Sequence, residues 1–127
     1  MNPLTVEWIE KAEGDFLTAS REFRARNAPN YDAVCFHAQQ AAEKFLKAIL
    51  QESGFPIPRT HSLADLLSLI LKNDPSFFVM QPELNEMEGY AVQYRYPGQT
   101  ADLLDARSAL SAAKTVRIFV KAKLHQE

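Results

Sequence analysis

The stretch that decides the fold is YDAVCFHAQQAAEKFLKAIL, residues 31–50. Its spacing predicts one uninterrupted helix, because at about 100° per residue its apolar side chains gather on one broad arc. An arc that wide suits a helix that touches several neighbours, and its small residues let other helices come close. We therefore expect this helix to be the centre of a bundle. The arc contains Val34, Ala38, Ala41, Ala42, Phe45, Ala48 and Ile49, with Cys35 and Leu46 at one edge.

Length and composition are those of a soluble folded domain. The chain has 127 residues, 46% of them hydrophobic and 24% charged, which fits one domain, residues 1–127, with a real core. The net charge of −2 provides no overall basic field to attract nucleic acid. The single cysteine, Cys35, excludes an internal disulfide and favours an inert packed thiol. No apolar run is long enough to span a bilayer, so we expect a cytoplasmic protein without a membrane contact.

The remaining chain predicts further helices separated by proline and glycine breaks. No segment alternates as a strand does, and no linker divides the chain. The predicted fold is all-α: an up-and-down antiparallel bundle of about five helices. The helices are expected from Leu4 or Thr5 to about Arg26, from Tyr31 to Glu52 or Ser53, from Thr60–Ser62 to Leu71, from Pro82 to about Tyr94, and from about Thr100 to Leu124, with Ser76–Gln81 either a packed loop or a helical turn.

Two charged residues lie close to apolar stripes. Asp15 borders the stripe of the first helix, where it is either an exposed carboxylate or the partner of a basic group on another helix. Arg117 points partly inward on the last helix, and an inward arginine usually needs a carboxylate. Asp15 and Glu43 are the candidate partners, so we predict an ionic link that joins Arg117 to them.

Familiar catalytic motifs are missing. The four glycines are scattered singly, so there is no phosphate-binding glycine loop. The three histidines lack metal-ligand spacing, and no serine lies in a nucleophile elbow. No inward Glu-x-x-His pattern of the di-iron bundles is present. We expect no metal and no cofactor.

Three groups of polar and aromatic residues form a candidate binding site. They are of the types that hold a nucleotide or an RNA end, because arginine binds phosphate bidentately and tyrosine stacks on bases. His61 opens the third helix, where the positive end of the helix dipole favours an anion. The competing interpretation is a solvated stripe, a helix cap and a core tyrosine. The candidates are His37, Gln40 and Lys44 on the second helix, His61, and Tyr94, Arg95 and Tyr96 after the fourth helix.

These residues also carry a family resemblance. The helix at residues 31–50, then Gly54, Thr60-His61-Ser62-Leu63 and Arg95-Tyr96-Pro97 before a long last helix together resemble a HEPN domain, a nucleotide-binding family of higher eukaryotes and prokaryotes. Trp8, Ala12 and Asp15 before Phe16 fit the opening of that family. The run Gln39-Gln40-Ala41-Ala42-Glu43-Lys44 is the most specific part, and the resemblance covers nearly the whole chain.

The resemblance implies a four-helix core with a short extra helix, in a protein that forms a homodimer. It also implies a separate minimal nucleotidyltransferase as partner, the two often acting as toxin and antitoxin. Many HEPN proteins are metal-independent ribonucleases whose signature is an arginine followed, after four to six intervening residues, by a histidine. After Arg95 the corresponding positions, Thr100, Ala101 and Asp102, contain no histidine. The resemblance therefore favours binding over cleavage.

Three hypotheses follow. The first is a HEPN binding module, a homodimer that binds a nucleotide or a nucleotidyltransferase partner. The second is a ribonuclease with a rearranged site, in which Arg95 stabilises the phosphate and His61 or His37 acts as acid or base. The third is a structural adaptor that uses exposed Phe36, Phe77 or Phe78 in a helix–helix interface.

Overall fold

The computed structural model describes residues 1–125 and is all-α over that range. The predicted fold class is confirmed: long helices run antiparallel, with no strand among the described residues. The elements are α1 (Pro3–Phe23), α2 (Tyr31–Glu52), α3 (Leu63–Leu71), the 3₁₀ helix η1 (Pro75–Met80), α4 (Gln81–Met87), α5 (Tyr90–Gln93) and α6 (Leu103–Leu124).

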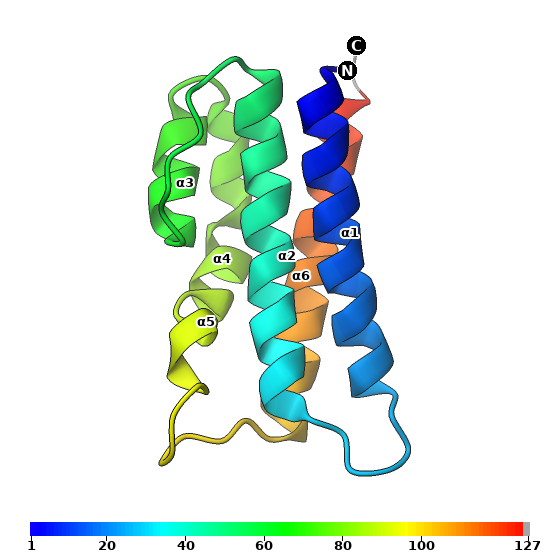
Figure 1. Ribbon diagram of the computed structural model, residues 1–127. Coiled ribbons are helices and arrows are strands. Elements are labelled where there is room, and N and C mark those ends of the chain that lie inside the picture. The colour runs from blue at the N-terminus through cyan, green and yellow to red at the C-terminus, as the bar shows by residue number, and fades with distance from the viewer. Residues whose placement is uncertain (126–127) are drawn as a thin grey trace.

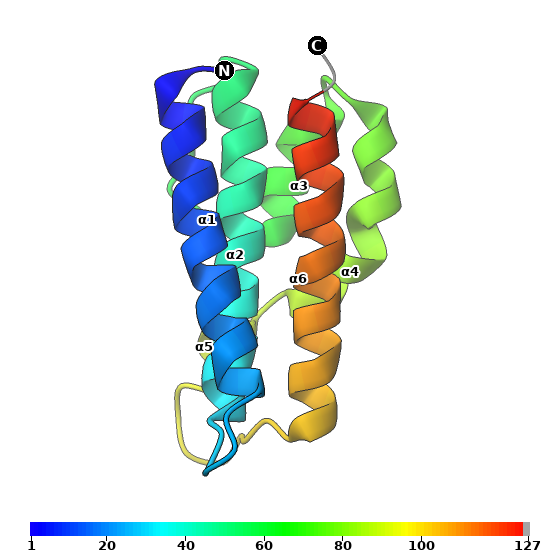
Figure 2. The same ribbon diagram turned by 90° about the vertical axis from the view of Figure 1, so that its right-hand side faces the viewer.

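The long helix α2 is the centre of the bundle. It lies between α1 and the shorter helices in Figure 1, and α6 passes behind it. It packs most extensively against α1 and α6, and also contacts α3, α4 and α5 (Figure 2). Most of its residues between 34 and 50 are buried, as the broad apolar arc predicts. The segments from α3 to α5 together fill the fourth position of the bundle.

Short polar side chains fix where the long helices begin. Asn2 accepts a hydrogen bond from the amide of Leu4, directly before the proline that starts α1. Asn30 caps α2 by accepting from Ala33, and Ser62 caps α3 by accepting from Asp65. These bonds satisfy amides that have no partner inside the helix. The predicted start of the second helix at Tyr31 is confirmed.

The fourth predicted helix is wrong in one respect: it is not continuous from Pro82 to Tyr94. The chain breaks at Gly89, whose φ of +90° lies in the left-handed region, so α4 ends at Met87 and α5 begins at Tyr90. A residue without Cβ enters that region at little steric cost. The break turns α5 toward the first turns of α2. Of the two alternatives left open for Ser76–Gln81, the helical turn holds, as η1.

Replacing glycine by alanine is expected to destabilise the protein at Gly89 and to stabilise it at Gly14. We expect Gly89→Ala to lower the free energy of unfolding by about 1–2 kcal/mol, because alanine is strained at positive φ. Gly14→Ala, inside α1, should raise it by up to about 1 kcal/mol, because a Cβ there meets nothing within 4 Å and alanine favours helix. Urea unfolding followed by circular dichroism measures both. Equal effects of the two substitutions would contradict the left-handed turn.

Two sequence predictions concern side chains in or near the core. Cys35 is fully buried, which confirms that its thiol is packed, and burial raises the pKa of that thiol to about 12. The prediction that Phe77 is exposed is wrong: it is buried and packs edge-on against Phe119, with ring centroids 4.9 Å apart. Phe78 is 60% exposed, and Phe36 is partly buried. Only Phe78 keeps the exposure that the adaptor hypothesis requires.

None of the helices within residues 1–125 is both long enough and apolar enough to cross a membrane.

Candidate functional site

A small pocket lies between the start of α2 and helix α5. Its volume is about 160 Å³. The capping residue and first two turns of α2 form one wall, and α5 with the two residues after it forms the other. We call this the α2–α5 pocket. Its lining residues are Asn30, Asp32, Ala33, Phe36, His37, Tyr90, Tyr94 and Arg95.

The wall formed by α5 presents two tyrosines and an arginine. The rings of Tyr90 and Tyr94 lie 5.7 Å apart, and the Tyr90 hydroxyl donates to Glu86. Burial raises the pKa of Tyr94, so its phenol stays neutral at physiological pH. Arg95 is exposed, and its side chain has no hydrogen-bond or ion-pair partner within residues 1–125. A guanidinium without a carboxylate is available to an anion.

The wall formed by α2 presents His37, which a carboxylate from α1 holds in place. His37 Nδ1 lies 2.8 Å from Asp15 Oδ1, and Lys44 Nζ lies 2.5 Å from Asp15 Oδ2. Asp15 is only 13% exposed, so it is the partner of basic groups on another helix and not a free surface carboxylate. Because an ionised carboxylate only accepts hydrogen bonds, this contact places a proton on Nδ1 and orients the ring.

A second carboxylate, that of Glu43 on α2, contacts a lysine and a histidine. Glu43 Oε2 accepts from Lys47 Nζ at 3.0 Å, and Glu43 Oε1 lies 3.0 Å from His61 Nδ1. The side chains of Glu43 and Lys47 are 4% and 8% exposed, whereas His61 is 74% exposed. Glu43 and Lys47 thus form a buried ion pair, with His61 covering it at the surface.

The structure brings together three of the seven candidate residues, namely His37, Tyr94 and Arg95 in the α2–α5 pocket. Lys44 binds Asp15 beside a separate groove along α1. His61 belongs to the Glu43 cluster, and Gln40 donates to the neighbouring Gln39. Tyr96 is 65% exposed and lines none of these pockets. The seven residues therefore do not line one pocket in this structure, although His37 and Lys44 share the carboxylate of Asp15.

The predicted ionic link of Arg117 exists with another partner. Arg117 donates through Nε and Nη2 to both oxygens of Glu13, at 2.6 and 2.9 Å, and does not bind Asp15 or Glu43. This bidentate contact lowers the pKa of Glu13 and raises that of Arg117. The difference has a simple cause: Asp15 and Glu43 already contact basic side chains of α2 and of the connector before α3, and Glu13 lies on the side of α1 that faces α6.

Sequence reasoning missed several residues that the structure makes prominent. Lys47 lies on the buried side of α2, where a lysine four residues after Glu43 is the available signal. Trp8 and Gln51 meet across α1 and α2, with Trp8 Nε1 donating to Gln51 Oε1 at 3.3 Å. The apolar periodicity of the sequence does not predict a contact between residues so far apart. Within the described range, no cluster of three or more histidine, cysteine or acidic residues is arranged to hold a metal ion.

Comparisons with known proteins agree with this architecture. The family model described as HEPN domain matches residues 5–123. A solved structure from Thermus thermophilus, TT1696, has a TM-score of 0.82 at 27% identity, covering 97% of this chain and 99% of that one. ST0689, described as an archaeal HEPN homologue, has a TM-score of 0.72 at 26% identity, covering 94% and 96%. No curated protein matches the sequence.

The fold is an all-α helical bundle whose central helix carries the buried ion pair of Glu43 and Lys47. The chain belongs to the HEPN domain family.

Proposed function

We propose that this HEPN protein is a nucleotide-binding interaction module, and that a phosphate of the ligand lies against Arg95 in the α2–α5 pocket. The observation that supports this most is the combination, in one pocket, of an unpaired arginine, a tyrosine ring and an oriented histidine. Arginine supplies paired donors to phosphate oxygens, and the tyrosine offers a face for a base. The pocket also lies at the positive end of the long helix α2.

The same proposal includes an assembly. The protein forms a homodimer and works with a minimal nucleotidyltransferase as a separate protein, in a toxin–antitoxin-like pair. Family membership supports this part. Light scattering is expected to give twice the chain mass, and co-expression with a nucleotidyltransferase encoded in the neighbouring reading frame should yield a complex. A strictly monomeric protein that retains no such partner would contradict the assembly.

Removing the guanidinium tests the pocket. A nucleotide at a hundred times its Kd should stabilise the wild-type protein by about 2.7 kcal/mol, through binding to the folded state alone. We expect Arg95→Ala to weaken binding at least tenfold, which lowers this stabilisation to about 1.4 kcal/mol. A thermal-shift series with ATP, GTP, CTP and UTP measures the difference.

The matched control is Arg59→Ala, which removes an exposed arginine from the connector before α3. It should leave the ligand-induced shift unchanged. The proposal fails if none of the four nucleotides raises the melting temperature, or if Arg95→Ala responds as the wild type does.

A ribonuclease is the second candidate, and the contact between Asp15 and His37 is the observation that favours it. With the proton on Nδ1 held by Asp15, the Nε2 atom of a neutral His37 is left as a base, in the same pocket as Arg95. Single-stranded RNA incubated with the protein in EDTA decides between the two candidates. Cleavage that His37→Ala abolishes would establish the ribonuclease, whereas intact RNA at high protein concentration excludes it.

A further inference from the structure

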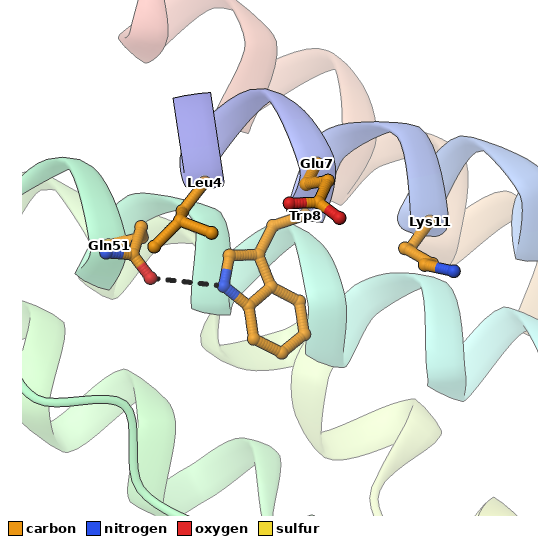
Figure 3. Close-up of a pocket in the computed structure, with 5 residues that line it drawn as sticks. All are labelled: Leu4, Glu7, Trp8, Lys11 and Gln51. Carbon is orange, nitrogen blue, oxygen red and sulfur yellow. Dashed lines mark hydrogen bonds between the residues drawn. The ribbon is translucent and has the colours of Figure 1, made fainter. Parts of the chain in front are cut away.

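We propose that a second pocket, around Trp8 at the opposite end of α2, binds a guanine base. The pocket has a volume of about 300 Å³ and is lined by Leu4, Glu7, Trp8, Lys11 and Gln51 (Figure 3). We call it the Trp8 pocket. His37 lies in the second turn of α2 and Gln51 in the last, so about 21 Å of helix separates it from the α2–α5 pocket. The two pockets are therefore independent sites.

The indole ring is held before any ligand arrives. Its Nε1 atom donates to Gln51 Oε1 at 3.3 Å, which fixes the ring along one edge (Figure 3). The Lys47 ammonium lies 5.6 Å from the ring centroid, and Lys47 is itself fixed by Glu43 and lines no part of the pocket. Trp8 thus lines the pocket with a ring whose edge is held by Gln51. A fixed aromatic face loses little conformational freedom when a base stacks on it.

The charges at the rim supply the selectivity. Glu7 and Lys11 project from α1, Glu7 beside Trp8 and Lys11 about one turn further along the helix (Figure 3). Both are exposed, and the side chain of neither has a hydrogen-bond or ion-pair partner within residues 1–125. The rim therefore offers one acceptor group and one donor group to a planar ligand stacked on Trp8.

Guanine matches this pair best among the bases. Its N1–H and N2–H groups are two parallel donors that suit the two oxygens of the Glu7 carboxylate. Its O6 and N7 atoms are acceptors that suit the Lys11 ammonium. Adenine and cytosine offer the carboxylate only an amino group, and uracil only one N–H. Leu4, which is 53% exposed, adds an apolar side chain to the lining of the pocket.

The protein contains a single tryptophan, so its tryptophan fluorescence reports on this pocket. Guanosine 5′-monophosphate should quench that fluorescence with saturation, at a Kd about tenfold or more below those of the other three monophosphates. Excitation at the red edge of the indole band limits absorption by the bases. Short single-stranded RNA with one guanine, against the same RNA with adenine, forms a second arm: saturation by the mononucleotide identifies a free nucleotide as the source, and saturation by the guanine RNA alone identifies RNA.

Surface variants test the roles of the rim without disturbing the core. Glu7→Gln and Lys11→Met should each weaken guanine binding at least fivefold. Glu10→Gln, on the same helix but outside the Trp8 pocket, should bind as the wild type does. The proposal is overturned if no guanine ligand quenches Trp8 with saturation, if all four bases bind alike, or if both rim variants keep wild-type affinity.

Arg95→Ala separates this site from the α2–α5 pocket. That variant should leave the quenching of Trp8 unchanged, because its side chain lies near the other end of α2. If quenching fails while Arg95→Ala still abolishes a nucleotide-induced thermal shift, only the guanine site is wrong. If quenching persists while Arg95→Ala has no effect on the shift, only the proposed function of the α2–α5 pocket is wrong.

Discussion

Glu43→Ala is expected to lower the free energy of unfolding by about 3–5 kcal/mol, because it leaves a buried charge without its partner. Lys47 is 8% exposed, and its ammonium contacts Glu43 at 3.0 Å in the interior beside Trp8. Once the carboxylate is gone, the ammonium must either stay charged in a poor solvent or lose its proton, and both cost free energy. Urea unfolding followed by circular dichroism measures the loss.

Two further variants separate the buried charge from other effects of the substitution. Glu10→Ala removes an exposed carboxylate from α1 and should change stability by no more than about 0.5 kcal/mol. The double variant Glu43→Met with Lys47→Met removes both charges and should lose less stability than Glu43→Ala alone. A loss below about 1 kcal/mol for Glu43→Ala, or a double variant that is no better, would show that the pair is not electrostatically buried.

Helix α2, which carries this ion pair, shows which features the sequence predicts. The bounds of α2 follow from its apolar period, its Asn30 cap and Gly54, whose φ of +80° marks the end of the helix. All of these are local properties, and local patterns can be recognised in a sequence. The expectation that Arg117 points inward and has a carboxylate partner also rests on a local pattern. The structure confirms that such a partner exists.

The identity of that partner is a different kind of fact. Glu13 and Asp15 are two residues apart on one helix, so they face different neighbours: Glu13 faces α6, and Asp15 faces α2. Choosing between them requires the rotation of α1 against both helices. That rotation depends on the packing of the whole interface and not on any one pattern. The sequence therefore predicts that an ion pair exists, but not which residues form it.

The candidate sites combine both kinds of information. Arg95 reaches the start of α2 because the chain breaks at Gly89, a glycine whose sequence signal is only a weakened helix. The Trp8 pocket depends on contacts between the first turns of α1 and the last turn of α2, more than 40 residues away. The sequence predicts the residue types of the α2–α5 pocket. It does not predict the contact between α1 and α2 that forms the Trp8 pocket.

Phe45→Ala is expected to lower the free energy of unfolding by about 3–5 kcal/mol, through lost apolar burial and the cavity left behind. Phe45 is fully buried near the middle of α2 and belongs to the cluster that joins α1, α2, α3 and α6. Because α2 carries His37 near one end and Gln51 near the other, loosening its centre affects the support of both pockets. The same unfolding measurement reports the loss.

Phe78→Ala is the matched control, since it removes the same ring from a position that is 60% exposed. It should cost no more than about 0.5 kcal/mol. Phe45→Leu, which keeps much of the volume, should fall between the two. If Phe45→Ala and Phe78→Ala cost the same, α2 would not be the packing centre of the bundle. Both pockets would then have to be supported by their own local contacts, and substitutions in the core would leave ligand affinity untouched.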